Sequence, residues 1–122
     1  MTHGPALPPV IRSITVGPDE ANRTATVCLG GDFNMANSPA VHEALARLQA
    51  DRPARLIIDL TAVDYMDSSG VAVLIQALQQ VRRHGGRLIL VGPNARVRSI
   101  FQIAKLDALF QIVNSQAEAQ AP

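Results

Sequence analysis

The chain has 122 residues, 48% of them hydrophobic, which is enough for one packed core and too little for two. Its 11 basic and 10 acidic residues are scattered and leave a net charge of +1, so no basic patch for nucleic acid is expected. Because the apolar runs are shorter than the roughly 20 residues that span a bilayer, and the N-terminus lacks the basic start and apolar core of a signal peptide, we expect a cytoplasmic protein without membrane insertion.

The first part of the chain predicts an arm, a hairpin and a helix. Residues 1–9 contain three prolines and are predicted to be a flexible arm. Residues 10–16 and 24–29 have strand character and flank a turn over residues 17–22, which predicts a β-hairpin. The Ser38-Pro39 pair predicts the start of a helix, with Ser38 as N-cap and Pro39 at the first helical position. Apolar residues then recur at helical spacing at Val41, Ala44, Leu45 and Leu48.

Two central strands and two helices are predicted further along the chain. Residues 55–60 are mostly apolar without alternation, as in a strand covered on both faces, and residues 87–91 repeat this pattern. Between these strands, residues 71–83 have the spacing of an amphipathic helix that stops at Gly85-Gly86. Another helix is predicted after Pro93-Asn94. Its apolar stripe consists of Val97, Ile100, Phe101 and Ala104.

The predicted order of elements is ββαβαβα with an open end. Residues 109–113 fit either a short last strand or the approach to a final helix, and residues 115–122 fit a flexible tail. Strands that alternate with helices at this spacing imply right-handed crossovers and a mostly parallel sheet, with the hairpin strand at one edge. The expected fold class is α/β, with one domain over residues 10–114 and helices packed against the central sheet.

The most informative segment is Met66-Asp67-Ser68-Ser69-Gly70, at a predicted strand-to-helix turn. Backbone N–H groups at a helix N-terminus lack partners and favour negative charge, so a serine there is a candidate phosphorylation site. The helical phase relative to the apolar stripe predicts that Ser69 points to solvent and that Ser68 is more enclosed. Either Asp67 or Ser68 is expected to cap the helix.

Val73 and Gln76 share the predicted exposed strip of this helix with Ser69. An exposed Val73 beside a modification site is a candidate part of a partner-binding patch. A phosphate on Ser69 would add nearly two negative charges there, weakening an interface by repulsion and desolvation. Because the helix N-terminus would stabilise the phosphate, modification is not expected to unfold the domain.

Five segments occur in an order that points to one family. They are residues 56–60, 66–70, 85–86, 88–91 and 97–101. In this order they resemble the STAS family, and within it the bacterial anti-sigma factor antagonists, also called anti-anti-sigma factors, over about residues 10–114. The Asp-Ser-Ser-Gly turn is the specific part of the resemblance, whereas the apolar pattern fits many α/β domains.

The resemblance implies a phosphorylation switch. In that family the second serine of the turn, here Ser69, is phosphorylated by a partner anti-sigma factor that is also a serine kinase. The unphosphorylated antagonist binds the anti-sigma factor and frees the sigma factor, the phosphorylated form lets go, and a serine phosphatase resets the switch. The candidate partner-binding residues are Asp32, Asn34, Asp67, Ser68, Ser69, Gly70, Val73 and Gln76.

Asn34 is a departure from the family pattern. The family's Gly-Glu-Leu-Asp segment after the second strand matches Gly31-Asp32-Phe33-Asn34, so Asn34 stands where an Asp is usual. If that Asp contacts the kinase, the lost charge alters affinity or partner choice. Asn keeps the hydrogen-bonding shape and remains a good turn residue.

Catalysis, metal binding and cofactor binding are not expected. The chain has no Gly-x-Ser-x-Gly elbow, and its three histidines are placed so that none forms an obvious pair with a serine. Asp59, Asp64 and Asp67 are better explained as solvated loop carboxylates than as a metal or phospho-aspartate site. A receiver-type site would need acids after the first strand and a lysine on a late strand, whereas the only lysine, Lys105, lies on a predicted helix.

The alternative is a non-switching STAS module, such as a cytoplasmic subunit of a lipid transporter or a stress-signalling scaffold. Its fold and turn would look the same, because a fold does not decide a function. A solvent-facing, phosphorylatable Ser69 favours the antagonist, since a structural subunit does not need one.

Overall fold

The computed structural model describes residues 9–17 and 23–121. The predicted arm, apart from Pro9, and the hairpin turn, apart from Gly17, lie outside these residues. The elements are β1 (Ile11–Val16), β2 (Thr24–Phe33), α1 (Ser38–Gln49), β3 (Arg55–Met66), α2 (Ser68–Arg83), β4 (Arg87–Val91), α3 (Ala95–Ile103), β5 (Gln111–Val113) and α4 (Gln116–Gln120).

The five strands form one mixed sheet in the order β1-β2-β3-β4-β5. The pair β1 and β2 is antiparallel, and each later neighbour is parallel to the one before it. The predicted α/β class, the mostly parallel sheet and the hairpin strand at one edge are therefore confirmed. The open question about residues 109–113 is answered by β5, which adds a fifth strand beside β4.

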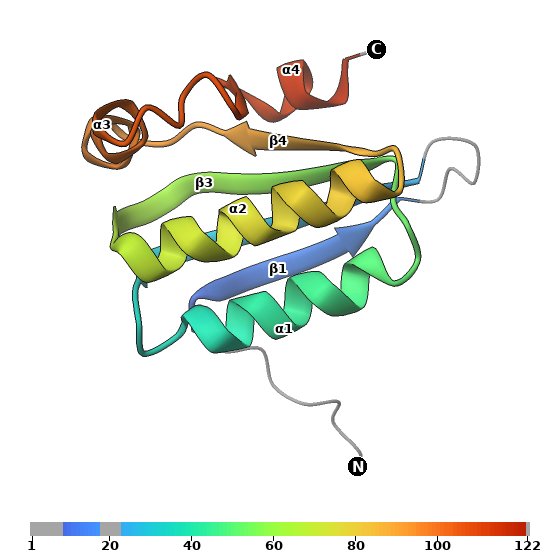
Figure 1. Cartoon of the computed structure of the whole chain (residues 1–122), viewed down its shortest axis with the longest axis horizontal. Helices are drawn as coiled ribbons and strands as arrows, with labels where there is room; N and C mark the ends of the chain where they lie inside the picture. Colours follow the sequence, from blue (N-terminus) through green and yellow to red (C-terminus); the bar gives the residue numbers. More distant parts are fainter. Residues whose placement is uncertain (1–8, 18–22, 122) are drawn as a thin grey trace.

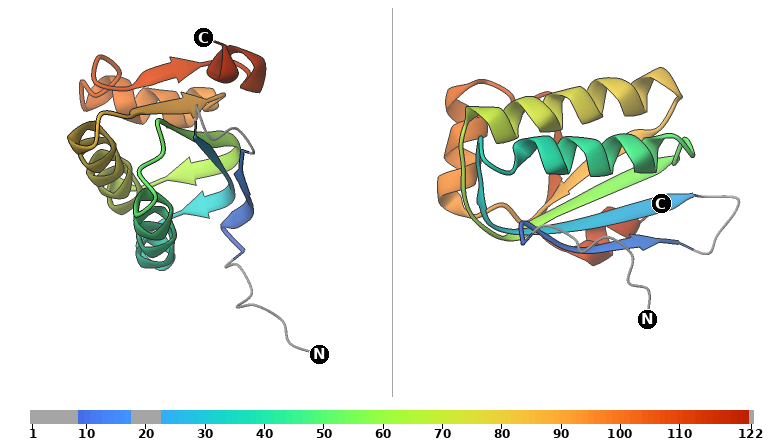
Figure 2. Two further views of the ribbon diagram at one scale, coloured as in Figure 1. Left: turned by 90° about the vertical axis from the view of Figure 1, so that its right-hand side faces the viewer. Right: turned by 90° about the horizontal axis from the view of Figure 1, so that it is seen from below.

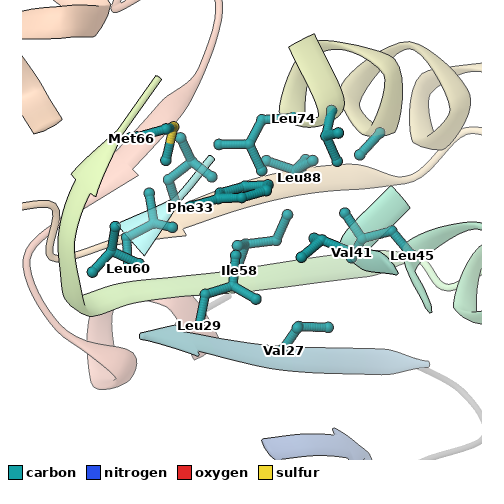
Figure 3. Packing of buried hydrophobic residues seen from close by; sticks show 14 of the residues in the cluster. Val27, Leu29, Phe33, Val41, Leu45, Ile58, Leu60, Met66, Leu74 and Leu88 are labelled. Carbon is teal, nitrogen blue, oxygen red and sulfur yellow. The ribbon is translucent and has the colours of Figure 1, made fainter. Parts of the chain in front are cut away.

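Helices cover both faces of this sheet. Helices α1 and α2 lie side by side on one face, and α4 lies on the other (Figures 1 and 2). Leu56, Ile58 and Leu60 of β3 face α1 and α2, in a core that Figure 3 shows in part, whereas Ile57 lies in a smaller cluster with Ala119. All of these side chains are fully buried, and for the β3 residues the mostly apolar run predicts this burial.

Strands β2 and β3 both extend beyond their predicted ends. Their parallel ladder continues to the pair Phe33 and Met66, with irregular register at Gly30 and Gly31. Gly31 has a φ of 74°, a conformation that glycine adopts without strain. Glycine is unfavourable in strands and indicates a turn, so the sequence suggested an earlier end. The extension brings the segment after β2 beside the start of α2.

The first helix begins at Ser38, one residue earlier than predicted, because its N-cap is Asn37 rather than Ser38. The Asn37 side chain forms no cap bond with the helix. Its Oδ1 accepts from the Asn34 N–H at 2.9 Å, and its Nδ2 donates to the Asp32 carbonyl at 2.7 Å. The expected cap is wrong because Asn37 holds the preceding loop instead.

Where the sequence predicted a flexible tail from residue 115, the structure has α4. Ser115 caps it, with Oγ accepting from the Glu118 N–H at 3.2 Å, and Ala119 is fully buried against the sheet. The Arg55 guanidinium donates to the Ala119 carbonyl at 3.2 Å. The Ser-x-x-Glu spacing of Ser115 and Glu118 is a helix-start signal that composition alone obscured.

Asp59 is a buried strand residue and not the solvated loop carboxylate that was expected. Its side chain is 8% exposed on the face beneath α4. It accepts hydrogen bonds from the Thr61 hydroxyl at 2.6 Å and from the Gln116 amide at 2.7 Å. Burial alone would raise the pKa of Asp59, but bonds from Thr61 and Gln116 outweigh burial and lower it. Asp59 therefore helps to hold α4 on the sheet.

Candidate functional site

The Asp-Ser-Ser-Gly turn lies at the edge of the sheet where β2 and β3 end. Because these strands are parallel, their carboxyl ends meet at one edge, a usual place for sites in α/β folds. We call residues 34–37, which follow β2, the Met35 loop. This loop and the N-terminus of α2 form the candidate site, and α3 lies at the same end of the molecule (Figure 1).

Asp67 is the N-cap of α2, as expected. One carboxylate oxygen, Oδ1, accepts from the Ser69 N–H at 2.9 Å, the Gly70 N–H at 3.2 Å and the Ser69 hydroxyl at 2.5 Å. The other, Oδ2, accepts from the Met35 N–H at 3.0 Å. The bond from the Ser69 hydroxyl does most to lower the pKa of Asp67, and the backbone bonds add to it. Asp67 is therefore an ionised carboxylate that joins α2 to the Met35 loop.

The two serines have exchanged the predicted environments. Ser68 is exposed, and its side chain makes no hydrogen bond within the described part of the chain. Ser69 is half-buried and donates its hydroxyl proton to Asp67. The predictions that Ser69 points freely to solvent and that Ser68 is the more enclosed residue are therefore wrong.

The predicted helical phase failed because α2 packs against α1 as well as the sheet. A second packed neighbour widens the buried arc and rotates its centre away from the sheet-facing stripe. Val73 lies within this wider arc and is only 7% exposed, so the prediction of an exposed Val73 is wrong. Gln76 is exposed, as expected. Of these two residues, only Gln76 offers its side chain to a partner.

Gly70 acts through packing rather than as an exposed contact. A Cβ added at this buried position would lie 2.7 Å from the Met66 Cγ and 3.0 Å from the Phe33 carbonyl oxygen. The first distance is shorter than real Cβ atoms show, and the second is tighter than most real Cβ contacts. Gly70 therefore allows the first turn of α2 to pack closely on the ends of β2 and β3.

Asn34 shapes the Met35 loop. Its Oδ1 accepts from the Ala36 N–H at 3.0 Å, an Asx turn, and its carbonyl accepts from the backbone N–H groups of Asn37 and Ser38. A carboxylate could accept the Ala36 bond equally well, so Asn in place of the usual Asp preserves the turn and removes a charge. Asp32, at the end of β2, is exposed and places a carboxyl side chain at this edge.

The sequence patterns did not indicate two exposed apolar residues at this edge. Met35 is 76% exposed, and Tyr65 is 43% exposed. Tyr65 also lines an open groove of about 250 Å³ between the start of α2 and α3. The other lining residues are Met66, Asp67, Ser68, Val71, Ile100 and Ala104. An apolar residue within a short polar loop, such as Met35, is the sequence signal that could have indicated this surface.

Neither a metal cluster nor a membrane-spanning helix occurs in the part of the chain that the structure describes. Among residues 9–17 and 23–121, no group of three or more His, Cys, Asp or Glu side chains is arranged to hold a metal ion. Within the same ranges, no helix has both the length and the apolar character needed to cross a membrane.

Comparisons with known proteins agree on the family. The family model described as STAS domain matches residues 18–119. The anti-sigma-B factor antagonist of Listeria monocytogenes is 34% identical over 92 residues, which cover 75% of this chain and 81% of the relative. An anti-sigma factor antagonist from Mycobacterium paratuberculosis has a similar structure, with a TM-score of 0.75 and 24% identity over 88% of this chain and 89% of that chain.

The same fold also occurs in a protein that is named as a transporter family member and not as an anti-sigma factor antagonist. A sulfate transporter family protein from Wolinella succinogenes gives a TM-score of 0.67 at 16% identity, covering 79% of this chain and 80% of that chain. Structural likeness at this identity establishes the fold alone, so the assignment depends on the matched family model and the sequence relatives. The chain therefore belongs to the STAS domain family and, within it, to the anti-sigma factor antagonists.

Proposed function

We propose that the chain binds an anti-sigma factor that is also a serine kinase, that binding releases a sigma factor, and that phosphorylation of Ser69 switches binding off. Family membership makes the chain a non-enzymatic regulator. Ser69 then acts as a phosphoryl acceptor, and the reaction is catalysed by the partner.

One observation carries this proposal: the Ser69 hydroxyl lies at the N-terminus of a long helix, half-exposed, at an edge that also presents Met35 and Tyr65. The helix dipole and the N–H groups of the first turn favour a phosphate there. A phosphate would add about two negative charges to a surface that already carries Asp32. A partner bound to the uncharged serine would lose affinity by repulsion and by the cost of burying the phosphate.

The remaining parts of the switch follow from this role. The kinase transfers the phosphoryl group of ATP to Ser69 Oγ, ADP leaves, and the hydroxyl proton passes to a base or to water. A serine phosphatase hydrolyses the ester and restores the binding form. The sigma factor, the kinase and the phosphatase would all meet the chain in the cytoplasm.

The second candidate function is a non-switching STAS module, such as a subunit of a transporter. Its support is the likeness to the sulfate transporter family protein, which shares the fold. The half-buried hydroxyl of Ser69, bonded to Asp67, is also compatible with a purely structural serine. The two functions therefore differ in whether modification at Ser69 changes partner binding.

The test is a capture experiment from host lysate with wild-type, Ser69→Ala and Ser69→Asp baits. Mass spectrometry identifies the bound proteins and maps phosphate on the wild-type bait. The proposed function predicts that wild type and Ser69→Ala retain a kinase-type anti-sigma factor and that Ser69→Asp loses it. Ser68→Asp is the matched control, since it adds the same charge at the neighbouring serine. Transporter subunits retained by all baits would support the second candidate instead.

A further inference from the structure

Asp67 shares its carboxylate between two parts of the candidate site. Its Oδ1 holds the first turn of α2 through Ser69 and Gly70, while its Oδ2 holds the Met35 N–H at 3.0 Å. We propose that Asp67 couples the phosphorylation state of Ser69 to the Met35 loop, so that a phosphoryl group on Ser69 releases Met35. This inference depends on the proposed function, in which Ser69 is the modified residue.

The hydrogen bonds of the Met35 loop are otherwise local. Asn34 bonds to Ala36 and Asn37, and Asn37 bonds back to the end of β2. Among the hydrogen bonds of the described residues, the one from the Met35 N–H to Asp67 is the only one that joins residues 34–37 to the start of α2. If Asp67 turns away, the loop loses its hydrogen bond to the helix that carries Ser69.

The two ends of the Met35 loop are fixed by buried residues. Phe33 is fully buried and paired with Met66 at the end of the ladder, and Ser38 is buried at the start of α1. Release of the Asp67 bond would therefore free a short segment without loosening the sheet. Within this segment Met35 is 76% exposed, and a methionine side chain adapts readily to an apolar partner surface.

A phosphoryl group on Ser69 would act on Asp67 in three ways. The ester oxygen no longer carries a proton, so the 2.5 Å bond from the hydroxyl to Asp67 Oδ1 is lost. The phosphate brings a charge of about −1.5 to −2 beside a carboxylate. Its oxygens are also acceptors for the same N–H groups of the first helical turn that Oδ1 now occupies. Each effect displaces the carboxylate, and with it the acceptor of the Met35 N–H.

The consequence is a change of surface as well as of charge. In the unmodified chain, Asp67 holds the exposed Met35 next to the start of α2. In the phosphorylated chain, Met35 is mobile, and a partner must order the loop before it can use this contact, which costs conformational entropy. Modification of Ser69 thus weakens binding at two places of the same edge.

The test measures amide hydrogen exchange in the full chain with phosphoserine incorporated at position 69 during translation. Protection of the Met35 N–H should fall by about fivefold or more, the effect of losing a hydrogen bond to a partly solvated charged group. The matched control carries phosphoserine at position 68, which is exposed and has no bond to Asp67, and it should keep Met35 protected. In Asp67→Ala, Met35 should already be unprotected, and phosphoserine at position 69 should cause no further loss.

Three results would overturn the coupling. They are unchanged Met35 protection with phosphoserine at position 69, an equal loss with phosphoserine at position 68, and a loss shared by the fully buried Leu74, which would indicate global destabilisation. None of these measurements requires the partner. The coupling can therefore fail while the proposed binding function holds. Conversely, the coupling can be observed even if binding of an anti-sigma factor is not.

Discussion

Replacing Asp67 by alanine removes the N-cap of α2 and the bond to the Met35 loop in one step. Loss of an N-cap costs about 1 kcal/mol. The bond from the Met35 N–H adds about 1 kcal/mol, less than is usual for a charged acceptor because Asp67 is partly solvated. We expect Asp67→Ala to lower the free energy of unfolding by about 2 kcal/mol, which shifts the Tm of a domain this size by about 6–10 °C.

Urea denaturation followed by circular dichroism measures this change, and Asp64→Ala is the matched control. Asp64 is an exposed aspartate three residues earlier, and its carboxylate makes no hydrogen bond among the described residues. Asp64→Ala should change the free energy of unfolding by less than about 0.5 kcal/mol. If Asp67→Ala were no less stable than Asp64→Ala, the reasoning about the cap would be refuted.

Asp67 should also make the stability of the domain depend on pH. Hydrogen bonding, from the Ser69 hydroxyl above all, lowers the pKa of folded Asp67 below its unfolded value. Its contribution is therefore fully present above the usual aspartate pKa of about 4 and is lost as the pH falls through the lower folded value. The stability difference between wild type and Asp67→Ala should shrink below about pH 4. A difference that grew on acidification would show that the folded pKa of Asp67 is raised instead of lowered.

Three further substitutions test the packing of the site and of α4. Gly70→Ala should cost about 1–3 kcal/mol because its Cβ would collide with Met66, and unchanged melting would contradict this close approach. Val73→Ala should lower the free energy of unfolding by about 2 kcal/mol because Val73 is buried, whereas Gln76→Ala should be nearly neutral. Equal effects of the two substitutions in thermal melting would show that Val73 is exposed after all. Ala119→Arg should displace α4 and increase amide exchange in β4, and an unchanged exchange pattern would show that α4 does not protect the sheet.

The sequence predicted the layers of the fold because its strongest patterns come from burial. Residues 56–60 are mostly apolar without alternation, and this pattern is typical of a strand that is covered on both faces. The end of α2 was equally predictable, because Gly85 has a φ of 82° that other residues adopt with strain. Patterns of this kind directly indicate whether a segment is buried or where a helix ends.

The extents of β2 and α4 were not predictable from local patterns. Gly30 and Gly31 favour a turn by propensity, and they stay in a strand because of pairing with β3 and the bond from the Gly30 N–H to the Val10 carbonyl. The last helix is short and polar in composition, and its stability comes from Ala119 and from the bond between Gln116 and Asp59. Both depend on contacts between segments far apart in sequence.

The sequence predicted where the residues of the candidate site lie in the fold, but not how each side chain is surrounded. The Asp-Ser-Ser-Gly turn identified the edge of the sheet, and Asp67 was an expected cap. The exposure of Ser68 and Ser69 depends on how α1 packs beside α2, which a helical phase calculated from one stripe does not contain. Met35 was missed because its link to Asp67 joins residues 32 positions apart.

The most direct test of the switch is the affinity of the purified chain for the anti-sigma factor that it captures, measured by calorimetry with and without phosphoserine at position 69. The proposed switch predicts tight binding of the unmodified chain and a loss of at least about tenfold with the phosphate, corresponding to about 1.4 kcal/mol or more. Equal affinity of the two forms would contradict the claim that Ser69 controls partner binding.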